Sequence, residues 1–105
     1  MAQFDVYNNP SKTSRKYYPY LVDIQSPYIS EIATRMVLPL GYASFFKNEA
    51  MTKLTPEITY ENKILLLLTP QISSVSAKLL KKPIGSLVHF REQIINSLDF
   101  AISGI

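Results

Sequence analysis

Cysteine is absent from this chain of 105 residues, and long apolar runs are scarce. Without cysteine, a disulfide scaffold and a thiolate metal site are both excluded, and the chain suits a reducing compartment. The longest aliphatic run spans residues 64–68, far short of the about 20 residues that a membrane-spanning helix needs. No basic leader precedes an apolar stretch, so we expect no secretory signal. These absences favour a cytoplasmic protein outside the membrane.

Histidine and glycine are also rare, which bears on catalysis. His89 is the one histidine, so a Ser-His-Asp arrangement would have to use it, and no nucleophile elbow occurs. Its other interpretation is a solvated residue in the first turn of a helix. Three glycines are too few for a phosphate-cradling loop, and no pair of acids has metal-ligand spacing. We therefore expect no enzyme activity, no metal and no cofactor.

The residues that are present predict one folded domain over 1–105, because 47% are hydrophobic and 18% are charged. The net charge of +3 is uneven, with more than half of the basic residues in two clusters: Lys12, Arg15 and Lys16, and Lys78, Lys81 and Lys82. The first cluster alternates with tyrosines in the segment 11–20. That segment suits either nucleic-acid contact or a solvated hairpin loop, and both interpretations stay open.

Seven evenly spread prolines favour short strands and turns. Residues 3–7 alternate, with Phe4 and Val6 on one face, which predicts a strand. In the next strand, Tyr20 and Val22 face one side and Leu21 the other. The remaining patterns predict strands over 17–24, 35–40, 57–60, 63–68 and 72–80, with a hairpin turn at 61–62.

From Leu87 the apolar period becomes helical, and Ser86 is a suitable N-cap. The expected core-facing stripe contains Leu87, Phe90, Ile94, Leu98, Ala101 and Ile105, widened by Val88, Ile95 and Ile102. The chain therefore reads as mainly β with one C-terminal α-helix.

The last residues of this helix have two compatible interpretations. Gly104 predicts a left-handed cap, beyond which Ile105 would contact Phe100, as in a Schellman motif. Alternatively, Phe100, Ser103, Gly104 and Ile105 form a small apolar platform for a partner. Asp99, the chain carboxylate and the helix carbonyls make this end acidic, which suits a basic group such as arginine.

Several segments together resemble the CcdB toxins of ccd toxin–antitoxin modules. They are QFDVY (3–7), YLVDIQS (20–26), RMVLPL (35–40), ISSVSAKLL (72–80) and the final SGI (103–105). The resemblance covers nearly the whole chain. It implies a dimer of CcdB/MazF-type subunits, each with an SH3-like twisted antiparallel sheet, a small accessory sheet and a C-terminal helix.

The resemblance also implies a function. Such toxins bind the A subunit of DNA gyrase and trap the enzyme covalently on cleaved DNA, without catalytic residues of their own. A CcdA-type antitoxin neutralises the toxin, and the two together repress their operon, so operator DNA is contacted only through the antitoxin complex. The alternatives are an endoribonuclease toxin of the same fold and a non-toxic dimeric binding module.

Site residues follow from the family pattern. Gly104 and Ile105 match its terminal Gly-Ile, whereas Ser103 stands where the family typically has tryptophan, and Phe100 is hypothesised to supply part of the missing aromatic surface. The expected gyrase-binding set is Asn96, Asp99, Phe100, Ser103, Gly104 and Ile105. The expected antitoxin-binding set, in the loop after VDIQS, is Ser26, Tyr28 and Ile29.

Overall fold

The computed structural model describes residues 2–26, 28, 32–47 and 53–104. The described chain is mainly β with one helix towards its C-terminus, as the sequence predicts. With η marking a 3₁₀-helix, the elements are β1 (Asp5–Asn8), β2 (Tyr20–Asp23), β3 (Thr34–Tyr42), β4 (Glu57–Tyr60), β5 (Lys63–Leu67), η3 (Thr69–Gln71), β6 (Ser73–Ser76), η4 (Ala77–Leu79), β7 (Gly85–Ser86), η5 (Val88–Phe90) and α1 (Arg91–Ser103).

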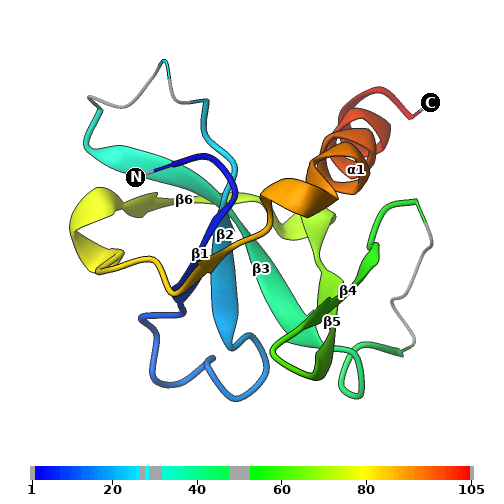
Figure 1. Ribbon diagram of the computed structural model, residues 1–105, viewed down its shortest axis with the longest axis horizontal. Helices are drawn as coiled ribbons and strands as arrows, with labels where there is room; N and C mark the ends of the chain where they lie inside the picture. Colours follow the sequence, from blue (N-terminus) through cyan, green and yellow to red (C-terminus); the bar gives the residue numbers. More distant parts are fainter. Residues whose placement is uncertain (1, 27, 29–31, 48–52, 105) are drawn as a thin grey trace.

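The strands form a curled antiparallel sheet in the order β4-β5-β3-β2-β1-β7, and β6 pairs with β3 outside this path. Figure 1 shows β6 on one side of the molecule, the β4–β5 hairpin on the other, and α1 at the upper right. The short strand β7 was not predicted from the sequence. It pairs Gly85 with Val6 and Ser86 with Asp5.

The longest strand, β3, changes partners along one of its edges. Residues Thr34–Val37 pair with β6, whereas Leu40–Tyr42 pair with β5. Pro39 lies between these two pairings, and its carbonyl accepts a hydrogen bond from the Leu68 amide at 3.0 Å. Proline has no amide hydrogen to donate. A proline inside a paired strand is therefore tolerated here because its nitrogen faces the gap between two partner strands.

The predicted hairpin at residues 61–62 is confirmed. Glu61 and Asn62 have positive φ values of 51° and 62°, and β4 pairs with β5 on either side of them. A two-residue turn with both residues in the left-handed region matches the twist of antiparallel strands. Asparagine accepts this conformation readily, which makes Asn62 the local signal for the turn.

The alternation predicted for β1 and β2 sorts their side chains onto two core clusters. Val6, Tyr20 and Val22 face the main core, where they meet Phe4, Ile24, Leu38, Leu40, Ile58, Leu65, Leu67, Leu87 and Ile94. Tyr7 and Leu21 face the opposite side and pack with Val37 and Leu80 in a smaller second cluster, against which Val75 lies. The sheet is therefore covered by apolar contacts on both faces.

The C-terminal helix differs from its prediction at its start and in its buried face. Residues Val88–Phe90 form a 3₁₀ turn whose N-cap is Leu87, and α1 begins after Phe90, so Ser86 is not the N-cap that the sequence predicted. The Ser86 hydroxyl accepts a hydrogen bond from the Val88 amide at 3.2 Å just before that turn. The stripe expected to face the core is too broad: Val88 is 59% exposed, Ile102 is 83% exposed and Ala101 is also exposed.

The reason is that α1 contacts the rest of the fold along a narrow line. Ile94 and Ser97 are its buried residues, while Ile95 and Leu98 are half-buried. A second correction concerns the strand expected over 72–80, which ends at Ser76. There the serine hydroxyl accepts from the Lys78 amide at 3.3 Å and begins η4.

Candidate partner-binding site at the helix end

Helix α1 is anchored at its middle and leaves its last turn exposed. The Ser97 hydroxyl lies 2.9 Å from the Thr69 hydroxyl of η3 and donates to the Ile94 carbonyl at 2.8 Å. All of these groups are buried. Residues 101–104 are exposed, and Figure 1 shows the end of α1 directed away from the sheet. The fold therefore holds the helix firmly and presents its end.

The predicted polar residues of this end share one exposed face. Asn96, Asp99 and Ser103 are exposed and lie three and four positions apart, which places them in register along a helix. The Ser103 hydroxyl donates a hydrogen bond to the Asp99 backbone carbonyl at 2.6 Å. The serine side chain is thus turned back along the helix, and this face offers small polar groups.

Gly104 caps the helix in the left-handed conformation, as predicted. Its φ is 75° and its ψ is 18°, and its amide donates to the Phe100 carbonyl at 2.9 Å. A Cβ atom at this position would meet nothing within 4 Å. Glycine is therefore favoured here by backbone conformation and not by crowding within the chain. Ile105 lies outside the described residues, so its contact with Phe100 stays a prediction.

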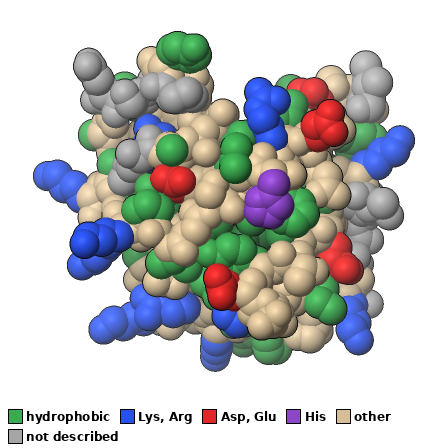
Figure 2. Space-filling view, in the orientation of Figure 1, with side chains coloured by type: hydrophobic (Ala, Val, Ile, Leu, Met, Phe, Trp, Pro, Cys, Tyr) green, Lys and Arg blue, Asp and Glu red, His purple; other side chains and the backbone are tan. Residues whose placement is uncertain are grey.

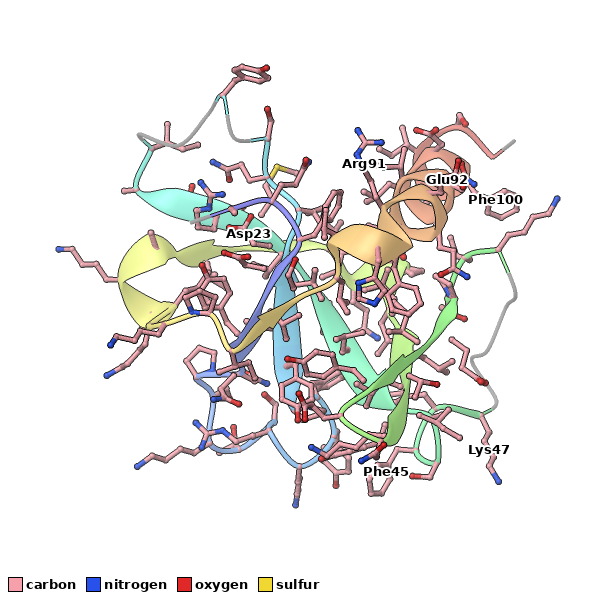
Figure 3. All side chains as sticks on the ribbon, viewed as in Figure 1. Asp23, Phe45, Lys47, Arg91, Glu92 and Phe100 are labelled. Atoms are coloured by element: carbon pink, nitrogen blue, oxygen red, sulfur yellow. The ribbon has the colours of Figure 1, made fainter. Side chains whose placement is uncertain are left out.

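Phe100 is half-buried and lies on the same side of α1 as Asn96 and Ser103, four residues after the first and three residues before the second. Figure 3 shows its ring on the outer side of α1, towards the segment that leads into β4. The Lys53 amine lies 5.9 Å from the ring centroid, within the range of a cation–π contact. Sequence reasoning missed Lys53, because no local pattern signals a residue so distant in the chain.

The end of the helix has acidic character. Its last turn contains no basic residue, and the free carbonyls of a helix end amount to roughly half a negative charge. Asp99 adds a full charge on the exposed side. A partner that offers an arginine would meet both a carboxylate and carbonyl acceptors.

The second predicted set lies in the connection between β2 and β3. Ser26 is half-buried, and its hydroxyl accepts a hydrogen bond from the Tyr28 amide at 3.2 Å. The Tyr28 side chain is 96% exposed, so it is available to a partner. Ile29 lies outside the described residues. Figure 1 places this connection and the end of α1 in the same upper part of the molecule, on different elements.

A buried ion pair fixes the chain where this connection begins. Arg35 Nε donates to Asp23 Oδ2 at 2.8 Å, and both side chains are at most 1% exposed. The other carboxylate oxygen of Asp23 accepts from the Gln25 amide at 2.9 Å. The Gln25 side chain in turn accepts from the Met36 amide at 3.0 Å. Asp23 and Gln25 of VDIQS are thus tied to the RMVLPL strand.

The segment 11–20 mixes solvated and packed tyrosines. Tyr20 is in the main core, whereas Tyr17 is 39% exposed and meets Phe45 edge-to-face at 5.1 Å. The Lys16 amine lies 5.1 Å from the Tyr17 ring centroid. The loop is closed by its own hydrogen bonds, including that from Arg15 Nε to the Asn9 carbonyl at 2.9 Å.

The described residues contain neither a candidate metal site nor a membrane-spanning helix. There, no three histidine, aspartate or glutamate side chains gather as a metal site would require. His89 is exposed in the 3₁₀ turn before α1, and its ring contacts Phe90 at a centroid distance of 4.4 Å. Within the same residues, α1 is too short and too polar to cross a bilayer, and no other helix qualifies.

The curled antiparallel sheet and the C-terminal helix are consistent with the CcdB fold that the sequence resembles. The family model described as CcdB protein matches residues 3–104. The match covers nearly the whole chain, so the chain belongs to the CcdB family. Membership places it among the toxins of toxin–antitoxin systems.

Proposed function

We propose that this chain is a non-enzymatic toxin that binds the A subunit of DNA gyrase and traps the covalent complex between gyrase and cleaved DNA. The observation that carries the proposal is the exposed, glycine-capped end of α1 in a member of the CcdB family. Binding alone suffices for such an inhibitor, because the partner enzyme performs the DNA cleavage.

The chemistry of the helix end supports this role. Asp99 and the free carbonyls attract a cation, while Phe100 adds an aromatic edge beside them. Ser103 contributes little contact area, so Phe100 and Ile105 carry the apolar part of the interaction in this proposal. Asn96 adds a hydrogen-bonding side chain one turn earlier on the same face.

The remaining partners follow from family membership. A CcdA-type antitoxin would bind at Ser26, Tyr28 and Ile29, where Tyr28 offers an exposed ring. The toxin would act as a homodimer in the cytoplasm and would reach operator DNA only within the antitoxin complex, which represses the operon.

A gyrase cleavage assay tests the proposal. Purified protein is incubated with gyrase, supercoiled DNA and ATP, and the mixture is then denatured. We expect linear DNA to accumulate, because trapped breaks persist when gyrase is removed. The same preparation is incubated with single-stranded RNA. RNA fragments without DNA cleavage would favour the endoribonuclease alternative, and the absence of both products would favour an inert binding module.

Variants of the helix end sharpen this test. Phe100→Ala should weaken poisoning by about tenfold, as expected for the loss of an aromatic contact at an interface, and Phe100→Leu should retain more activity.

Gly104→Asn keeps a residue that tolerates the left-handed cap and meets no neighbour in the chain. A loss of poisoning in this variant would therefore report a close approach by gyrase. Lys47→Ala, on an exposed lysine distant from α1 (Figure 3), is the matched control.

One result would separate Phe100 from the rest of the site. If Phe100→Ala left gyrase binding unchanged while deletion of Ile105 abolished it, Phe100 would not replace the missing aromatic residue. The proposal for the helix end as a whole would survive that outcome, because Gly104 and Ile105 would still be required.

A further inference from the structure

A cleft of about 430 Å³ opens beside the second core cluster, between the β1–β2 loop and the β6–η4 segment. Its apolar walls are Tyr18, Leu21, Pro39, Val75 and Leu79. Leu21 belongs to the second cluster and Val75 packs against it, so the cleft continues that core towards solvent. Leu79 at its mouth is 51% exposed. The fold thus leaves an apolar recess uncovered.

A second hollow of about 310 Å³ adjoins this cleft and is bordered by cations. The two hollows share Asn9, Pro10 and Leu79 as lining residues. Four basic side chains line the second hollow: Lys12, Arg15, Lys81 and Lys82. Among the described residues, no aspartate or glutamate lines either hollow. Figure 2 shows basic side chains gathered along the left and lower-left edge of the molecule.

These cations come from the two basic clusters of the sequence, which the fold brings together. The β1–β2 loop supplies Lys12 and Arg15, and the segment after η4 supplies Lys81 and Lys82. The Arg15 side chain is held by its bond to the Asn9 carbonyl, so its guanidinium is fixed at the rim. Four like charges around one hollow repel one another, and an anionic partner would relieve that repulsion.

The combination restricts the chemistry of an occupant. The apolar walls suit a large aliphatic or aromatic side chain, whose burial is favourable, and the rim suits carboxylates. A nucleic acid would match the charge, but binding of single strands depends on aromatic platforms. Tyr18 is the one aromatic residue among the cleft walls, so the observations favour a polypeptide.

We propose that this cleft and its rim dock an acidic polypeptide segment that inserts one large apolar side chain beside Leu79. The site is separate from the helix end, because the β1–β2 loop and the end of α1 lie at opposite corners of Figure 1. The protein could therefore hold such a segment while its helix end is engaged. The proposal goes beyond gyrase poisoning and does not depend on it.

Peptide display tests this proposal. A random peptide library is selected on the immobilised full chain after counter-selection on the double variant Lys81→Glu/Lys82→Glu, which removes peptides that bind elsewhere. We expect the surviving peptides to combine aspartate or glutamate with one large apolar residue. No surviving peptide, or survivors without an excess of acidic residues, would overturn the proposal.

Affinities of one selected peptide, measured by fluorescence anisotropy, give the second readout. Lys81→Glu/Lys82→Glu and Leu79→Ser should each weaken binding by about tenfold, and salt should weaken it further. Lys47→Glu, which changes one lysine at a distant corner, should bind as the unmodified chain does. Equal binding by all variants would contradict the proposal. So would an oligothymidine strand that displaces the peptide and binds more tightly than it does.

Discussion

At the scale of single residues, the polar groups of the VDIQS segment act inside the fold. Asp23 and Arg35 are fully buried against each other, next to the apolar side chains of the second cluster. Burying two charges is costly, and the cost is offset only while both partners remain. The pair links the end of β2 to the start of β3 and so sets where Ser26 and Tyr28 emerge.

Breaking this ion pair should be strongly destabilising. Asp23→Asn and Arg35→Met each leave one buried charge without its partner, and we expect each to lower the free energy of unfolding by about 3–5 kcal/mol. The double variant Asp23→Asn/Arg35→Met should recover part of that loss, because no charge is left buried. Urea denaturation of the four proteins measures the coupling. Additive losses would contradict a direct interaction between the two side chains.

Unlike Asp23 and Arg35, which pair with each other, the Tyr7 hydroxyl is buried without a hydrogen-bond partner among the described residues. Tyr7→Phe removes that hydroxyl, so we expect the free energy of unfolding to rise by about 1 kcal/mol. Burial, with smaller contributions from Asp5 and Asp23, raises the pKa of Tyr7 above its ordinary value of 10.0.

The raised pKa of Tyr7 gives this prediction a pH signature. Above about pH 10 the unfolded chain releases the tyrosine proton while the folded chain retains it, so the unmodified protein loses stability as pH rises. Tyr7→Phe lacks this contribution. The gap between their melting temperatures should therefore widen from about pH 9 to about pH 11. A constant gap would mean that Tyr7 does not titrate differently in the two states.

At the scale of elements, the sequence correctly predicted the features whose structure is determined by neighbouring residues. Alternation in β1 and β2, the turn at Glu61 and Asn62, and the left-handed cap at Gly104 each depend on a few neighbouring residues. The strand β7 is only two residues long and is defined by its pairing with β1. No pattern within two residues could have signalled it.

The helix shows the same limit more clearly. Its apolar period correctly predicted a helix, but period cannot tell which apolar residues meet the core and which meet solvent. Tertiary contacts decide that α1 buries Ile94 and Ser97 while Val88 and Ile102 stay exposed. At the candidate site, the cap at Gly104 was predictable because it depends on neighbouring residues. Lys53 beside Phe100 was not predictable, because the two residues are distant in the sequence.

At the scale of the whole molecule, the misplaced apolar residues of the helix become informative. Val88, Ile95 and Ile102 are seven residues apart, which aligns them along one side of the η5–α1 segment. Val88 and Ile102 are mostly exposed, whereas Ile95 is half-buried and packs against the main core as predicted, so Val88 and Ile102 are the two misplaced residues. Large apolar side chains gathered on one helix side mark a surface that a second protein covers. The homodimer proposed above would cover this surface with a second copy of the chain.

This interpretation predicts that charge on the apolar side of the helix separates the two copies of the chain. The double variant Val88→Asp/Ile102→Asp should sediment with the mass of one chain where the unmodified protein sediments as two, because apolar contact is replaced by repulsion between carboxylates. Its circular dichroism should be unchanged, since neither side chain is part of the core. Glu92→Lys, which alters an exposed charge of the same helix, serves as the control and should stay dimeric. A double variant that remained dimeric would place the dimer contact elsewhere, and the exposed stripe would then be free for a different protein.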